Sequence, residues 1–225
     1  YSRRAIMDSM IAKCEAVRAV NPDVYLNITS GTWLSPWWLR YANQIWMQGN
    51  DFGFADVPSV SQRDASMTYK DFVLYNDFHT QDEWFPLSHL MTHGIIKGRL
   101  NEIGGADDPL RNFTNDAVFY FARGVTMFEL YISPDMLNKG EWNALSKSLK
   151  WAEGNFEVLR HTDMVGGDPT QGKPYGYVHF QGDKGIIAVR NPSMTADSIR
   201  VTLDSRYGLN PGAGSLVVER VYPTR

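Results

Sequence analysis

Short apolar runs and longer helical patterns alternate along the first two thirds of the chain. An amphipathic helix is predicted over residues 3–20, where apolar side chains recur at helical spacing. It should end at Asn21-Pro22, because a proline disfavours a helical conformation at the residue before it. The same reasoning predicts strands over residues 24–29, 44–48, 85–91 and 125–132, and helices that begin at Ser35-Pro36 or span 69–76, 113–123 and 142–160. Strands that alternate with helices indicate a parallel sheet.

The pattern changes in the last third of the chain. Short strands are predicted there, separated by Gly-Asp, Asn-Pro and Asn-Pro-Gly turns, over residues 175–180, 185–190, 198–203 and 216–222. Such a series is typical of an antiparallel β-sandwich. The boundary falls within residues 162–172, which predicts two domains, residues 1–163 and residues 164–225.

Four strand–helix units correspond to half of an eightfold barrel, because a complete barrel takes roughly 250 residues. The expected fold is therefore α/β: the second half of a (β/α)8 TIM barrel followed by an antiparallel β-sandwich domain. The chain opens at Tyr1 inside a predicted helix, so we expect it to be a fragment whose partner is the N-terminal half of the same protein.

Composition excludes several classes of protein. The chain has 225 residues, with 43% apolar and 21% charged side chains, which is typical of a folded protein. A net charge of −3 gives no reason to expect nucleic acid, and no apolar run is long enough to span a membrane. The single cysteine, Cys14, excludes an internal disulfide. A periplasmic or secreted location is expected, although the cytoplasm is also compatible.

Aromatic and polar side chains follow the first predicted strand. In a parallel barrel the functional groups lie on the loops after the strands. Asn27 could bind sugar hydroxyls there, although short polar side chains also cap backbone groups. Trp33, Trp37 and Trp38 come next, and Trp33 is the one expected to face a sugar ring, with packing in the core as the alternative for all three.

The loop at residues 49–66 follows the strand at residues 44–48 and carries two candidate carboxylates. Asp51 lies between aromatic side chains, which could desolvate its carboxyl group and keep it protonated as a general acid. Its alternative interpretation is a turn aspartate, since Gly-Asn-Asp-Phe-Gly favours a turn. Asp56 is the second choice for the general acid and is otherwise expected to bind substrate.

Two histidines, His89 and His93, lie four residues apart near the strand at residues 85–91. This spacing brings side chains together only on a helix, and no third ligand is nearby, so no metal site is expected. We expect a hydrogen bond to substrate instead, with His93 as the candidate. A long loop is predicted to follow, over residues 92–112. For Glu129 we expect a structural ion pair with Arg99 or Arg123.

The order of the motifs resembles the melibiase-like glycoside hydrolases, the clan of α-galactosidases and α-N-acetylgalactosaminidases. Four segments carry this resemblance: QIWMQGNDFGF (44–54), FPLSHLMTHGII (85–96), ELYISPDMLNKGEW (129–142) and EVLRHTDMVGGDPTQGKPYGYVHF (157–180). Together they span most of the chain.

The resemblance implies a retaining glycosidase with two catalytic aspartates and no cofactor. Its nucleophile would precede residue 1, and its acid/base would lie in the loop after residues 44–48. The family often has Trp, an aliphatic residue, Ser and then the catalytic Asp, whereas Gly49 occupies the acid position here and Asp51 follows two residues later. A retaining enzyme needs its two carboxyl groups about 5–5.5 Å apart.

Two functions follow from these observations. The first is a retaining exo-glycoside hydrolase that acts on terminal α-galactoside or α-N-acetylgalactosaminide linkages of an oligosaccharide or glycoconjugate. The alternative is a non-catalytic carbohydrate-binding barrel relative that has lost its acid/base, which Gly49 favours.

Overall fold

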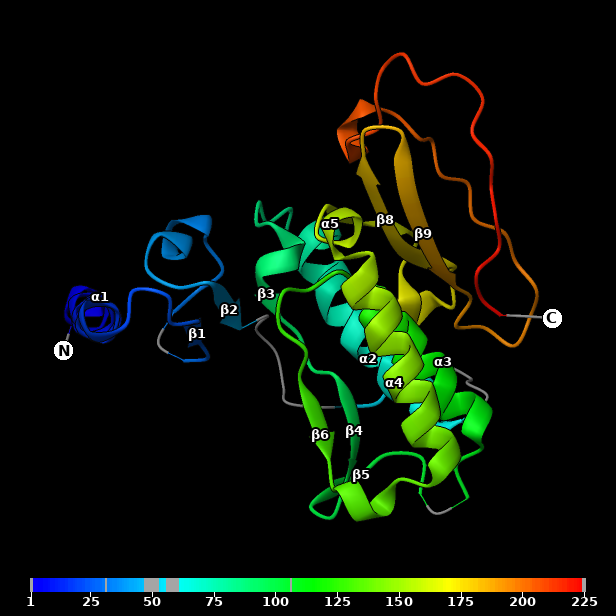
Figure 1. Cartoon of the computed structure of the whole chain (residues 1–225), viewed down its shortest axis with the longest axis horizontal. Helices are drawn as coiled ribbons and strands as arrows, with labels where there is room; N and C mark the ends of the chain where they lie inside the picture. The colour runs from blue at the N-terminus through cyan, green and yellow to red at the C-terminus, as the bar shows by residue number, and fades with distance from the viewer. Residues whose placement is uncertain (1, 31, 47–52, 56–60, 106, 224–225) are drawn as a thin grey trace.

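The computed structural model describes residues 2–30, 32–46, 53–55, 61–105 and 107–223 (Figure 1). Helices and strands are mixed along this part of the chain. The α-helices are α1 (Arg3–Val20), α2 (Gln62–Tyr75), α3 (Leu110–Phe121), α4 (Lys139–Gly154) and α5 (Phe156–Leu159). The strands are β1 (Asn27–Ile28), β2 (Gln44–Trp46), β3 (Leu90–Met91), β4 (Ile95–Gly98), β5 (Asn101–Glu102), β6 (Leu130–Ile132), β7 (Thr162–Gly166), β8 (Tyr175–Gln181) and β9 (Lys184–Arg190).

Short helical turns complete the list of elements. Five are 3-10 helices: η1 (Pro36–Arg40), η3 (Leu87–His89), η4 (Pro134–Met136), η5 (Pro169–Gln171) and η6 (Ser205–Tyr207). The turn η2 (Asn76–Thr80) is π-helical and continues α2.

The first helix and the first sheet follow the predicted pattern. Helix α1 begins after Ser2, whose side chain accepts a hydrogen bond from the Ala5 amide, and it ends at Val20 as expected. Strands β1, β2 and β3 pair in parallel in that order, as predicted, whereas β6, from the strand predicted at residues 125–132, pairs with β4 in a separate sheet. All three are shorter than the apolar runs suggested. The helix predicted at Ser35-Pro36 forms as η1, capped by Ser35.

The prediction of a loop over residues 92–112 was wrong. Strand β4 occupies Ile95–Gly98, turns back antiparallel into β5, and pairs in parallel with β6 on its other side. Ile95 and Ile96 are both buried, and Ile95 packs in a cluster with apolar side chains of α3 and α4. The apolar run is only two residues long and follows a glycine, so the sequence pattern did not indicate a strand here.

Helices α2, α3 and α4 run between the β4–β6 pair and the β8–β9 hairpin in Figure 1, while α1, β1 and β2 lie at the opposite end of the molecule from β8 and β9. Helix α2 begins at Gln62, well before the predicted start at residue 69, after the N-cap Ser61. Its first two turns are buried although they carry charged side chains. The hydrophobic pattern of the sequence therefore could not predict that these two turns belong to the core.

The third sheet is antiparallel, in the order β7-β8-β9, and it includes both strands predicted at residues 175–190. Strand β7 begins at Thr162, so the sheet includes residues on both sides of the expected boundary after residue 163. Residues 198–203 and 216–222 form no strand. Ile199, Val201 and Leu203 pack on the sheet without a backbone ladder, because apolar packing does not require strand pairing.

Candidate functional site

A histidine–carboxylate pair lies where β3 ends and β6 begins. His93 Nδ1 is 2.6 Å from Glu129 Oε2, and the two side chains are 3% and 13% exposed. The carboxylate accepts a hydrogen bond from Nδ1–H and so fixes the orientation of the imidazole ring. This finding corrects the expected partner of Glu129. Arg99 pairs with Asp135 at the surface, and Arg123 pairs with Asp71 in the interior.

The backbone around this pair is tightly packed. Glu129 donates its amide N–H to the Tyr120 hydroxyl at 2.7 Å. A Cβ at Gly94 would lie 1.7 Å from the Glu129 carbonyl oxygen, so only glycine permits this approach of the two segments. The residue after His93 therefore has to be small for the pair to form.

Aromatic rings surround the imidazole of His93. The Trp46 ring lies edge-on to it at a centroid distance of 4.5 Å, and the Tyr131 ring lies at 5.7 Å. Trp46 is the last residue of β2, and the candidate acids Asp51 and Asp56 follow it in the chain. Both acids lie outside the described residues, as does Gly49. The structure thus brings the strand that precedes Asp51 into contact with His93.

The other two predicted binding residues lie on β1 and on the loop after it. Asn27 is half-buried, and its amide nitrogen is 2.8 Å from Met91 Sδ on β3. Its Oδ1 is buried and accepts no hydrogen bond within the described ranges. Trp33 is 46% exposed and packs edge-on against the fully buried Trp38 at 5.5 Å. The three tryptophans therefore separate into one core residue and two exposed ones, Trp33 and Trp37.

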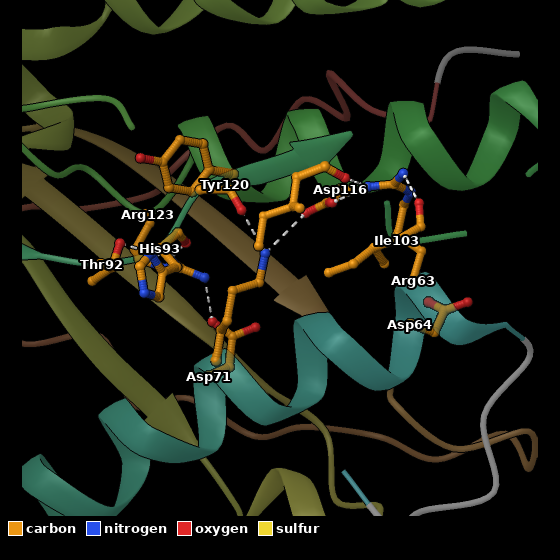
Figure 2. Close-up of polar contacts among 12 residues, drawn as sticks. Arg63, Asp64, Asp71, Thr92, His93, Ile103, Asp116, Tyr120 and Arg123 are labelled. Carbon is orange, nitrogen blue, oxygen red and sulfur yellow. Dashed lines mark hydrogen bonds and ion pairs between the residues drawn. The ribbon is translucent and has the colours of Figure 1, made fainter. Parts of the chain in front are cut away.

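A buried charged network on α2, α3 and the segments they contact escaped the sequence analysis (Figure 2). Arg63 donates to Asp108 at 2.6 Å and to Asp116 at 2.9 Å, and it also reaches the carbonyl oxygens of Ile96 and Ile103. All five hydrogen-bonding directions of a guanidinium can be used in such a position. This arginine joins α2, α3 and the β4–β5 hairpin.

Lys70 forms the second part of the network and lies beside the His93 segment. Its Nζ donates to the Gly94 carbonyl oxygen at 2.8 Å and lies 3.8 Å from Asp116 Oδ1. Burial lowers the pKa of Lys70, and the nearby Asp116 carboxylate opposes that effect.

Asp71 forms the third part and links the helices to the antiparallel sheet. It accepts hydrogen bonds from Arg123, Tyr175 and Tyr177, each at 2.6 Å. Burial raises the pKa of both tyrosines well above their usual value, so both hydroxyls stay protonated and donate. Arg123 in turn donates to the Thr92 hydroxyl at 2.8 Å, directly before His93.

One sequence signal could have indicated this network. Arg63, Met67, Lys70 and Leu74 lie on one face of α2 at helical spacing, so cations occupy a stripe that apolar residues would normally fill. Spacing alone cannot distinguish such a stripe from a solvated face, because the acidic partners come from other segments.

The structure also bears on metals and membranes. His89 Nδ1 is 2.8 Å from the Asn43 carbonyl oxygen, whereas His93 Nδ1 contacts Glu129. No cluster of three or more His, Cys, Asp or Glu side chains suited to a metal occurs among the residues whose positions are described. Over the same residues, no helix combines the length and apolar character needed to cross a bilayer.

Comparison of the chain with protein-family models, with curated proteins and with solved structures finds no match in any of the three.

Proposed function

We propose that the chain is the second half of a (β/α)8 barrel with a following β-domain, and that it belongs to a retaining exo-glycoside hydrolase acting on terminal α-galactoside or α-N-acetylgalactosaminide linkages. The observation that carries the proposal is the contact of Trp46 with the His93–Glu129 pair. Trp46 ends β2 and His93 follows β3, the parallel neighbour of β2, so both lie at the carboxyl edge of the sheet, where barrel enzymes carry their functional groups, while Glu129 comes from the segment before β6. The four family-like segments add support from the sequence.

In this proposal Asp51 is the acid/base. It gives its proton to the glycosidic oxygen while a second aspartate, which the resemblance assigns to a segment before residue 1, bonds to the anomeric carbon as the bond to the leaving oxygen breaks. Asp51 then takes a proton from water, whose oxygen displaces the enzyme carboxylate. His93, held by Glu129, and Asn27 bind sugar hydroxyls, and Trp33 packs on a ring face.

The experiment compares hydrolysis of aryl α-galactosides and aryl α-N-acetylgalactosaminides by the full-length protein and by its Asp51→Asn variant, with Asp56→Asn as the matched control; residues 1–225 alone should be inactive, because they carry at most one of the two catalytic carboxylates. General acid–base groups contribute about 100-fold or more, so Asp51→Asn should lose at least that much activity. The loss should be larger for a disaccharide than for a nitrophenyl glycoside, because a poor leaving group needs the proton more.

Two outcomes would contradict the assignment. If Asp56→Asn shows the large loss and Asp51→Asn does not, then the acid/base is Asp56. If the protein binds these sugars but hydrolyses none of them, the carbohydrate-binding alternative replaces the enzyme, and Gly49 at the acid position becomes its explanation.

A further inference from the structure

Arg123 follows α3 and contacts three separate parts of the molecule. Its Nη1 donates to the Thr92 hydroxyl at 2.8 Å and lies 3.5 Å from the His93 carbonyl oxygen, while its Nη2 donates to Asp71 at 2.6 Å. Its Nε donates to the Tyr177 hydroxyl at 3.2 Å. A planar guanidinium held on all its edges has one orientation, so its contacts to residues 92 and 93 are fixed by those to Asp71 and Tyr177.

Two further side chains, Lys70 and Glu129, also hold the segment that Arg123 contacts. Lys70 holds the Gly94 carbonyl oxygen from the α2 side, and Glu129 holds the His93 ring from the β6 side. Thr92 itself is buried. Figure 2 shows Arg123 together with Thr92, His93 and Asp71. A displacement of Arg123 would change its contacts with residues 92 and 93, and through them the geometry of the His93–Glu129 pair.

Two tyrosines of β8 provide a contrast within this arrangement. Tyr175 and Tyr177 are both fully buried, and both donate to Asp71 at 2.6 Å. Only Tyr177 also contacts Arg123, whereas the hydroxyl of Tyr175 accepts from Arg190 at 2.7 Å. One tyrosine thus touches the residue that holds the His93 segment, and the other touches a different arginine.

We propose that Arg123 is a positioning residue for the His93–Glu129 pair, and that Tyr177 of the antiparallel sheet sets its orientation. Through this contact the sheet formed by β7, β8 and β9 determines the geometry of the candidate site instead of merely adjoining it. The effect on turnover rests on the proposed glycosidase function, while the effect on His93 itself does not.

The test compares Tyr177→Phe with Tyr175→Phe in the full-length protein. Each variant loses one hydroxyl that donates to Asp71, so we expect both to lower Tm by a similar amount, about 2–8 °C. The His93 ring signals, assigned in ¹⁵N-histidine spectra by their loss in His93→Gln, should shift in Tyr177→Phe. They should stay at their parent positions in Tyr175→Phe.

Hydrolysis of aryl α-galactoside supplies the second readout. Tyr177→Phe should lower kcat about tenfold with KM changed less than about twofold, because a misplaced group near the reacting atoms costs rate rather than ground-state binding. Tyr175→Phe should keep kcat within about twofold of the parent value.

The outcomes separate this proposal from the function it builds on. If both variants leave the His93 signals unchanged, or both shift them equally, the positioning role is overturned. If the parent protein hydrolyses no aryl glycoside, the enzyme proposal fails, and the His93 spectra still decide whether Tyr177 and Arg123 position the pair.

Discussion

The two faces of β8 are both buried, yet different interactions hold them. On one face Tyr175 and Tyr177 donate to Asp71 of α2, and His179 donates from Nδ1 to the Leu159 carbonyl oxygen at 2.8 Å. On the other face Val178 and Phe180 pack against apolar side chains that approach without strand pairing. Hydrogen bonds fix the orientations of the side chains on the first face. On the second face, apolar packing only requires that the apolar surface be covered.

His179 shows how the polar face accommodates an ionisable side chain. Burial lowers its pKa to about 4, so the ring is neutral at physiological pH and costs no charge desolvation. Asp71 differs, because it forms an ion pair with the Arg123 guanidinium at 2.6 Å. The polar face therefore combines one neutralised group with one paired group.

The largest expected effect comes from removing the charge on the polar face. Asp71→Asn leaves the buried Arg123 without its carboxylate, and breaking a buried pair in this way costs about 3–5 kcal/mol. Urea unfolding followed by tryptophan fluorescence measures the loss. Asp8→Asn is the control, because its pair with Arg4 is exposed and should contribute less than about 1 kcal/mol. Equal losses in the two variants would show that the Asp71 network is not a special feature of this face.

A smaller effect is expected from adding a polar group to the apolar face. Val178→Thr keeps the shape but buries a hydroxyl among apolar side chains, which costs about 1–3 kcal/mol when it finds no acceptor. Val189→Thr on β9 is the matched control, since Val189 is 51% exposed and its hydroxyl would be solvated. The same urea experiment applies, and a cost no larger than that of Val189→Thr would contradict the distinction between the faces.

The smallest effect concerns a buried carboxylate that lacks the cation of Asp71. Burial, with the nearby Glu83, raises the pKa of Asp77 to about 7, while a hydrogen bond from Asn76 opposes the shift. A raised carboxyl pKa means that stability is fully present below about pH 4 and is lost as pH rises through about 7. Asp77→Asn should therefore stabilise the protein by about 1 kcal/mol at pH 8 and have no effect of this origin at pH 4.

Unfolding of parent and Asp77→Asn at several pH values between 4 and 8 measures this difference. A difference that stays constant over the range, or a variant less stable than the parent at pH 8, would contradict the raised pKa.

Part of the candidate site could be predicted from the sequence. His93 was a candidate because it follows a predicted strand, whereas Trp46, inside the strand predicted at residues 44–48, was not; the structure brings their rings together. The partner of Glu129 could not be predicted, because three cationic or basic side chains were available and sequence separation does not select among them. His93 pairs with Glu129 only because β3 and β6 bring the two side chains within hydrogen-bond distance.

The same limit applies to the buried charges of α2. Arg63 and Lys70 lie on the inner stripe of the helix, and their partners Asp108 and Asp116 are more than forty residues away. A charged stripe normally faces water. Whether it is buried depends on acids and carbonyl groups that other segments bring within hydrogen-bond distance.

By itself, the sequence determined the elements whose signals are local. Apolar spacing with a serine cap set α1, Ser35-Pro36 set the start of η1, and the β8–β9 hairpin followed from strand-forming runs around a Gly-Asp turn. These signals act over a few residues, through backbone dihedrals and neighbouring side chains.

Only the tertiary structure decided which polar side chains are buried and with whom they pair. It placed Arg123 between Asp71, Tyr177 and Thr92, and it packed residues 198–203 on the third sheet without a strand ladder. Both results depend on contacts between segments far apart in the chain. A charge can be buried only where such contacts supply its partners, and no local pattern contains that information.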